Sequence, residues 1–337
     1  MSRKIMILLI LIISFSTVFF SEIIYNNLDY NVVALVNGEK VNVEVLNSRS
    51  QIIYILSDLS RAYPDFYTVL TNTDAGIDLL NTYLLDQAIK LTNQILFIQF
   101  VEQKGIDLKR EETMNSINRT FANVFKEAGI ADEEIEDYLL ALGYTSKANY
   151  LEDTFYLVLY DSAVAELYFK VMDQISVTEE EILQEYQSNQ SKYMSPPSAE
   201  LKIIRFSNSN EASFTYNRII EGYYTFDEVF NQNLSSTSVT LNLEDSSDPL
   251  VQTIKNNPPG FIFGPVLYDK EDNSYALVKI ERKYPSRQLS LEEVRELIIY
   301  NLKDNKAKEY FDKTLPEEFK TFQDSSTIII NALLFGL

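Results

Sequence analysis

Cysteine and histidine are both absent from the 337 residues of the sequence. Without cysteine, the chain forms no disulfide, no thiolate nucleophile and no thiolate metal site. Without histidine, it lacks the commonest general base, the commonest transition-metal ligand and the usual pH switch. A calcium site needs only oxygen ligands, but no aspartate-rich loop with EF-hand spacing occurs. We therefore expect no cofactor, no metal and no catalytic triad built on histidine.

Basic residues are also scarce, since 29 Lys and Arg stand against 49 Asp and Glu and give a net charge of −20. A nucleic-acid binder needs a basic footprint, which is not evident here. Anionic lipid would repel such a chain. We therefore expect no nucleic-acid partner, and membrane contact only through the N-terminus. The hydrophobic content of 46% is that of a folding chain, long enough for two domains with cores.

The N-terminus has the charge and hydropathy pattern of an export signal. Arg3 and Lys4 precede an apolar run from Ile5 to Phe20. Residues 1–21 are therefore expected to be a signal peptide that is removed, or an N-terminal anchor that is retained in the inner membrane. In both cases the rest of the chain is expected in the periplasm or otherwise outside the cytoplasm.

Helices dominate the first half of the exported chain. The apolar run Val32 to Val36 predicts a strand, and Asn37-Gly38 after it is a strong two-residue turn signal. Asn42 is placed to cap one helix that runs through Leu56. Ser60 to Gly76 is expected to be a loop. Further helices are expected over 79–104, 111–127, 132–142 and 146–174.

A capped helix follows from Val177 to Pro197. Thr178 is placed to cap it, and Glu181 stands three residues later, so a capping box can close. The acidic residues there are better explained by capping and by the helix dipole than by a metal site. The helix is expected to stop at Pro196-Pro197, which marks a domain junction.

Beyond the prolines the pattern changes to short strands and helices. Residues 198–284 predict the order βααβαββ, which is a small mixed module. Ser290 and Glu293 form a second capping box at the start of a long helix that bends or ends at Pro316. A final strand, Ser326 to Leu334, is expected to pair with Val32–Val36 and to bring this helix back onto the N-terminal helices.

The expected fold class is therefore α+β, with four segments. Residues 1–21 are the signal or anchor, and residues 30–195 form a mostly helical domain. Residues 198–284 form the small module. Residues 286–337 form the helix and strand that pack back on the N-terminal domain.

Several stretches in this order resemble exported chaperones and prolyl isomerases of the SurA, PpiD and PrsA type. VVALVNGEKVNVEVL (Val32 to Leu46) resembles the opening strand, turn and first helix of that family. VTEEEILQEYQSNQSKY (Val177 to Tyr193) resembles its linker helix. GFIFGPVLY (Gly260 to Tyr268) and NSYALVKIERK (Asn273 to Lys283) resemble the last two strands of a parvulin, the PpiC-type isomerase module. The resemblance covers nearly the whole exported chain.

The resemblance implies that the chemistry of the parvulin is missing. Parvulins place one histidine in the first strand and one in the last, and alignment puts Ile203 and Ala276 at these positions. The glycine-rich segment of parvulins is also missing. The resemblance thus implies a chaperone that holds unfolded exported polypeptides without ATP, with an inactive isomerase module. An active peptidyl-prolyl isomerase and a membrane-anchored scaffold stay open as alternatives.

Aromatic residues are the candidates for peptide binding. Phe261, Phe263 and Tyr268 could line a groove of the module, although Phe261 and Phe263 share a strand face and are better explained as part of the module's core. Tyr63, Phe66 and Tyr67 could contact unfolded clients, because tyrosine makes adaptable contacts at low entropic cost. The alternative for these three is ordinary packing between helices.

Overall fold

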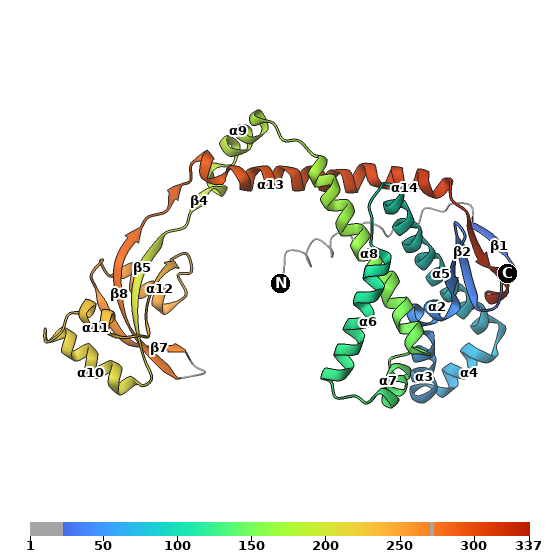
Figure 1. Ribbon diagram of the computed structural model, residues 1–337, viewed down its shortest axis with the longest axis horizontal. Coiled ribbons are helices and arrows are strands. Elements are labelled where there is room, and N and C mark those ends of the chain that lie inside the picture. The colour runs from blue at the N-terminus through green and yellow to red at the C-terminus, as the bar shows by residue number, and fades with distance from the viewer. Residues whose placement is uncertain (1–22, 270–272) are drawn as a thin grey trace. The chain divides into compact units, whose positions relative to one another are not determined.

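The computed structural model describes residues 23–269 and 273–337, so the expected signal or anchor lies outside the described residues. The chain divides into two compact units, drawn in Figure 1. The helical unit comprises the chain up to Ser176 together with Lys303–Leu337, and the module unit is Val177–Leu302. The domain boundaries expected at 195–198 and at 284–286 differ from these divisions and stay a prediction.

Most of the helical unit is built from helices joined by short turns. Gly105, Gly129 and Gly143 follow three of the helices with positive φ, as helix-ending glycines do. The helices are α2 (Val43–Ser50), α3 (Ile52–Ala62), α4 (Pro64–Asn72), α5 (Asp74–Gln103), α6 (Arg110–Glu127), α7 (Ile135–Ala141), α8 (Lys147–Gln174) and α14 (Leu315–Asp324), with a 3-10 turn at Asp132–Glu134. α13 (Leu291–Glu309) contains the boundary between the units and passes through a π-helical turn, Tyr310–Thr314, into α14.

The sheet of the helical unit joins both ends of the described chain. Its strands are β1 (Ile23–Asn26), β2 (Val32–Val36), β3 (Glu39–Asn42) and β10 (Ile328–Asn331), in the order β1-β10-β2-β3. β10 runs antiparallel to β2, which confirms the expected pairing of the first and last predicted strands. β1, which the sequence analysis did not expect, adds in parallel on the other side of β10. A 3-10 turn at Ala332–Leu334 ends the last strand earlier than expected.

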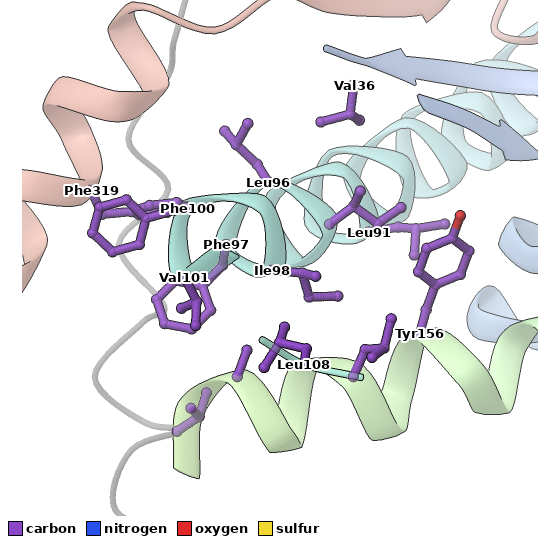
Figure 2. Packing of buried hydrophobic residues seen from close by; sticks show 14 of the residues in the cluster. Val36, Leu91, Leu96, Phe97, Ile98, Phe100, Val101, Leu108, Tyr156 and Phe319 are labelled. Carbon is purple, nitrogen blue, oxygen red and sulfur yellow. The ribbon is translucent and has the colours of Figure 1, made fainter. Parts of the chain in front are cut away.

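The C-terminal segment completes the core of this unit. Phe319 of α14 lies 5.4 Å, between ring centroids, from both Phe97 and Phe100 of α5 (Figure 2). Phe311, in the π-helical turn, is buried in the same cluster and stacks near Tyr168 of α8. The expected return of the final helix onto the N-terminal helices is therefore confirmed.

Three local expectations in the helical unit were wrong. Gln51 adopts φ +53° and divides the single expected helix into α2 and α3. The expected loop at Ser60 to Gly76 contains α4, which starts at Pro64, a residue suited to the first helical position. Asn42 precedes α2, but its side chain makes no capping hydrogen bond; its amide nitrogen donates to Glu152 at 2.7 Å.

The module unit contains a four-stranded antiparallel sheet in the order β6-β5-β8-β7. Its elements between residues 198 and 284 follow the expected order βααβαββ. They are β5 (Ser198–Phe206), α10 (Ser209–Ile220), α11 (Phe226–Gln232), β6 (Ser236–Asn242), α12 (Pro249–Asn256), β7 (Ile262–Asp269) and β8 (Ser274–Tyr284). With the helical unit, this confirms the α+β fold class.

The linker helix of the module unit, α9 (Glu179–Ser188), has the expected capping box. The Thr178 hydroxyl accepts from the Glu181 N–H, and the Glu181 carboxylate accepts from the Thr178 N–H. The expected stop at the two prolines was wrong, because α9 ends at Ser188 and the short pair β4 (Met194–Ser195) and β9 (Arg287–Gln288) comes before β5. Tyr193 draws the chain away from the helix by packing into a small cluster with Ile182 of α9 and with α13.

Candidate functional site

Apolar side chains are exposed along α3 and α4 of the helical unit. Tyr63 is 66% exposed and Phe66 is 54% exposed, although both are large aromatic residues. The helices pack against one another, and of α3 only Ile52 is buried. Large exposed apolar patches mark interaction surfaces. We call this set the α3–α4 apolar surface: Ile53, Tyr54, Ile55, Tyr63, Phe66 and Val69.

The turns around α4 fix this surface in place. Tyr63 leaves the helical conformation between α3 and α4, and Pro64 begins the next helix. Gly76, at the start of α5, lies against the Leu70 backbone so closely that any Cβ would collide with the Leu70 carbonyl oxygen. α4 is thus held close to α5 by backbone contact, and Phe66 on α4 is exposed.

A hollow of about 530 Å³ lies at the end of α3 beside Tyr63. Its two charged side chains, Asp58 and Arg61, form an ion pair at 2.5 Å and so neutralise one another. The remaining lining is apolar or aromatic, with Leu59 and Ala62 next to Tyr63. The hollow therefore suits an apolar side chain more than a charged one.

The structure brings two of the three aromatic candidates in this region to the surface. Tyr63 and Phe66 are exposed, and Tyr67 is half-buried. Ile53, Tyr54 and Ile55 were not among the binding residues expected from the sequence. The signal was available in the run IIYIL, which has no polar residue and is therefore too apolar to be a helix with only one buried face.

A second apolar groove lies between α6 and α8, with a volume of about 330 Å³. Phe121 and Phe125 form its floor, and their ring centroids are 4.6 Å apart. Val124 and Val158 line it and are exposed. Lys147 lies over the Phe121 ring, with its ammonium nitrogen 4.8 Å from the centroid. The sequence analysis did not identify this groove.

In the module unit, Ile203 and Ala276 lie on the same face of the sheet. The register pairs Ile203 with Val278 and Ala276 with Arg205, so the two side chains are diagonal neighbours. Ile203 is 7% exposed and Ala276 is fully buried. α12 covers this face, and Ile254 from that helix joins the same hydrophobic cluster. The face is thus filled by apolar side chains of the module itself.

The three aromatic candidates of the module lie in different environments. Phe263 is buried in the cluster beneath α12, as the core alternative expects. Phe261 precedes β7 and is partly exposed, with its ring stacked on Phe263 at 6.0 Å between centroids. Tyr268 is exposed at the far end of β7, under the guanidinium of Arg205. Of these three candidates, Phe261 and Tyr268 therefore offer aromatic surface and Phe263 does not.

The opposite face of the sheet carries a charge cluster instead. Lys202 and Lys279, paired across β5 and β8, each donate to the Asp227 carboxylate at 2.7 Å. Hydrogen bonds from these two ammonium groups, Lys202 first, lower the pKa of Asp227. The cluster ties α11 to the sheet. Glu281 also belongs to the cluster, with one carboxylate oxygen 2.9 Å from the Lys279 ammonium nitrogen. Two positive charges thus face two negative charges, which gives the cluster the character of a structural contact.

Within residues 23–269 and 273–337, no helix is long and apolar enough to span a membrane. The same residues contain no cluster of three or more carboxylates placed to hold a metal ion.

A family model matches the module unit. Residues 177–296 match the PPIC-type PPIASE domain, the peptidyl-prolyl isomerase class also called parvulin-like. The match begins at the first residue of the module unit and includes all four strands of its sheet. The chain thus carries a PpiC-type, parvulin-like module.

Similarity to individual proteins extends beyond that module. Foldase protein PrsA of Clostridium perfringens strain 13 is 25% identical over 299 residues, which are 84% of this chain and 82% of that protein. PrsA of a second strain, ATCC 13124, gives the same figures. This chain is therefore similar to PrsA-type foldases, which agrees with the resemblance seen in its sequence.

Solved structures to which this chain is similar include a foldase PrsA from Streptococcus pneumoniae, 18% identical with a TM-score of 0.30, covering 77% of this chain and 89% of that one. Another comes from the study of PEB4 and the periplasmic protein Cj1289, described as SurA-like chaperones of Campylobacter jejuni. It is 17% identical with a TM-score of 0.31, covering 61% of this chain and 92% of that one.

Proposed function

We propose that this protein is an ATP-independent chaperone that holds unfolded exported polypeptides. The observation that carries the proposal is the α3–α4 apolar surface, where aromatic and aliphatic side chains of two neighbouring helices face solvent. Unfolded chains expose apolar residues, and burying them against such a surface is favourable by roughly 25 cal/mol per Å². The likeness to PrsA-type foldases supports the same function.

The charge of the chain fits this function. A protein with exposed aromatic residues tends to associate with itself, and a net charge of −20 opposes that association. The peptide-binding residues in this proposal are Tyr63, Phe66 and Tyr67 in the helical unit, with Phe261 and Tyr268 in the module. Phe263 is left out because it is buried.

The module is proposed to lack isomerase activity. Ile203 and Ala276, at the positions where parvulins carry histidine, have no group that can donate or accept a proton. The surrounding face is filled by Ile254 and other side chains of the module. A substrate proline would need this face to be open. The module then acts as a folded spacer or a secondary contact for clients.

Suppression of client aggregation tests the holdase function. The exported part of the chain, at stoichiometric amounts, is expected to suppress the aggregation of several chemically unfolded proteins. The double variant Tyr63→Ser with Phe66→Ser should lose most of this effect, because both rings leave the α3–α4 apolar surface. Phe169→Ser is the matched control, since Phe169 is equally exposed on α8. Equal suppression by all three proteins would show that the α3–α4 apolar surface is not the client-binding site. No suppression by the wild type would reject the holdase function.

An active isomerase is the second candidate, favoured by the match to the PPIC-type domain. It predicts faster cis–trans exchange in a proline-containing peptide than in a blank with bovine serum albumin. Wild-type exchange at the blank rate would reject it. Acceleration that survives purification and fails after heat denaturation would instead reject the inactive module.

The location is proposed to be periplasmic or otherwise extracytoplasmic, with the N-terminal segment either removed or kept as an anchor. Fractionation of the native protein decides between these forms. Recovery in the soluble extracytoplasmic fraction supports removal, and recovery with membranes after a high-salt wash supports a membrane-anchored protein.

A further inference from the structure

β6 (Ser236–Asn242) is an outer strand of the module sheet. Among the described residues it pairs only with β5, through seven consecutive residue pairs from Ser198↔Asn242 to Ile204↔Ser236 and without a register shift. Its side away from β5 therefore presents a regular row of backbone groups. A regular open edge is where another extended chain can add.

The register identifies which backbone groups point outward. The Leu243 N–H donates to the Pro197 carbonyl at 2.8 Å, so the backbone groups of these two residues point toward one another. In an antiparallel ladder, hydrogen-bonded and non-hydrogen-bonded pairs alternate. Thr237, Val239 and Leu241 thus direct their backbone groups to β5, and Ser238 and Thr240 direct theirs away from it. Both outward residues are exposed, and no hydrogen bond between described residues uses their N–H or C=O groups.

The opposite edge of the same sheet is protected in a way that β6 is not. β7 contains Pro265, which has no N–H to offer, and its register with β8 shifts twice. Proline, charge and irregularity are the usual protections of an edge strand. β6 has the sequence STSVTLN, with no proline, no charge and no irregular pair. The contrast within one sheet points to β6 as the edge that receives a partner.

The surroundings of β6 select the chemistry of that partner. Glu244, Asp245 and Asp248 follow the strand directly, and the first two are exposed. Leu234, two residues before the strand, is fully exposed and offers an apolar contact. A second copy of the chain would bring another net charge of −20 to the same edge, which opposes self-pairing. The favoured occupant is therefore a foreign, neutral or basic segment.

We propose that β6 is a docking edge for an extended, neutral or basic segment of a client polypeptide, which joins the sheet as an added strand. The backbone of the client would pair with Ser238 and Thr240, so recognition depends little on client sequence. Proline at a facing position of the client would be excluded, because that position must donate an N–H. The inference rests on the proposed function for the identity of the client and adds the way it binds.

Substitution at Ser238 tests the edge in the full exported chain. Ser238→Pro removes one outward N–H but no donor to β5, and proline is tolerated on strand edges. Ser238→Ala is the matched control, because it keeps the N–H. The probe is a short fluorescein-labelled peptide in which Val alternates with a second residue, either Lys or Thr. Ser238→Pro is expected to weaken its binding about tenfold, and Ser238→Ala about twofold or less. Equal binding by both variants would overturn the proposal.

Peptide chemistry gives a second test that uses only wild-type protein, so a folding defect of Ser238→Pro does not leave the question open. The same peptide is made with N-methyl groups on alternate residues, in the two possible phases. One phase blocks the donors that face β6, and the other blocks donors that face solvent. We expect one N-methylated peptide to bind about tenfold more weakly than the other. Two equal affinities would reject strand addition.

Two further measurements separate this proposal from the holdase proposal and from self-pairing. If Tyr63→Ser with Phe66→Ser loses aggregation suppression but keeps phase-dependent peptide binding, both proposals stand. If the wild type suppresses client aggregation but binds the two N-methylated peptides equally well, only the proposal for the β6 edge fails. Sedimentation of the wild type and of Ser238→Pro tests the other occupant: a dimer that becomes a monomer in the variant would mean that β6 pairs with a second copy, which overturns the proposal.

Discussion

The candidate binding residues of the two units differ in exposure. In the helical unit, α3 and α4 keep Tyr63, Phe66 and neighbouring aliphatic side chains in solvent. In the module unit, Ile203 and Ala276 are buried with α12 over them. One unit therefore offers ready contact surface, and the other has turned its sheet face into a closed core. The difference indicates that clients would contact the exposed surface of the helical unit, and that the module would contact them through the edge of β6 and not through this sheet face.

The largest change in stability is expected from a substitution that leaves a cavity in the core of the helical unit. Phe311→Ala should lower the free energy of unfolding of that unit by about 3–5 kcal/mol, because Phe311 is buried among residues of α8 and the C-terminal segment. Urea unfolding followed by circular dichroism measures the change. Phe169→Ala, at an exposed phenylalanine, should change stability by about 0.5 kcal/mol or less. A small effect at Phe311 would mean that the returning segment is not part of this core.

A second substitution tests whether the module face is closed. Ala276→His places an imidazole where no space is left, and overpacking of this kind costs about 1–3 kcal/mol. We expect a lower midpoint of urea unfolding and no isomerase activity. Tyr284→His, at the exposed end of the same strand, is the control. A stable variant that accelerates prolyl exchange would show that the face opens to substrate, and the contrast between the units would fail.

The junction between the units allows a smaller test. Thr178→Ala removes the side-chain half of the α9 capping box and should cost about 1 kcal/mol. Chemical unfolding of the module unit, expressed as Val177–Leu302, measures this loss of stability when the segment folds by itself. Otherwise the same measurement is made on the full chain. Glu180→Ala changes a charge in the same turn without removing the box. If it matches Thr178→Ala, the stabilisation belongs to the helix dipole and not to the cap.

The smallest expected effect is a dependence on acid. Arg287, by its hydrogen bonds, lowers the pKa of Glu293 from 4.5 to about 2, and the Ser290 N–H adds to the shift. A folded-state pKa below the unfolded value means that Glu293 stabilises the protein above pH 4.5 and that this contribution disappears as the pH falls toward 2. Urea midpoints between these two pH values should fall less steeply for Glu293→Gln than for the wild type. Glu292→Gln is the charge-matched control, and an equal change in both variants would contradict the assignment.

Much of the fold was predictable because its signals are local. The strand Val32–Val36, the turn at Asn37-Gly38 and both capping boxes follow from short residue patterns, and the structure has each of them. The pairing of the first and last predicted strands was also predictable, because each would otherwise leave its backbone groups unpaired. The order of elements in the module followed from the alternation of strand and helix patterns.

Two of the wrong expectations concern residues that distant parts of the chain contact. Asn42 could cap α2, but Glu152 of α8 takes its amide. α9 could continue to Pro196, but packing of Tyr193 against α9 and α13 ends it earlier. Gln51 has no turn-forming side chain, so its positive φ between α2 and α3 was not predictable from its residue type.

The candidate site was predictable only in part, because exposure depends on what the remaining chain covers. Tyr63 and Phe66 are exposed, at the junction of α3 and α4 and on α4, in a segment that was expected to be a loop. Phe261 and Phe263 stand two residues apart, and only Phe263 is buried. The edge of β6 could not be found from the sequence, since strand order decides which strand lies outermost.

The strand β10 gives the protein a fixed order of assembly. In the sheet it lies between β1 and β2, although it comes at residues 328–331. Because synthesis runs from the N-terminus, β1 and β2 cannot pair with β10 until the whole of Val177–Leu302 has been made. The module needs only its own residues to close its sheet, and pairing across so long a separation is slow. The helical unit is therefore the last part to mature, and loss of a few C-terminal residues would leave it unfinished while the module is intact.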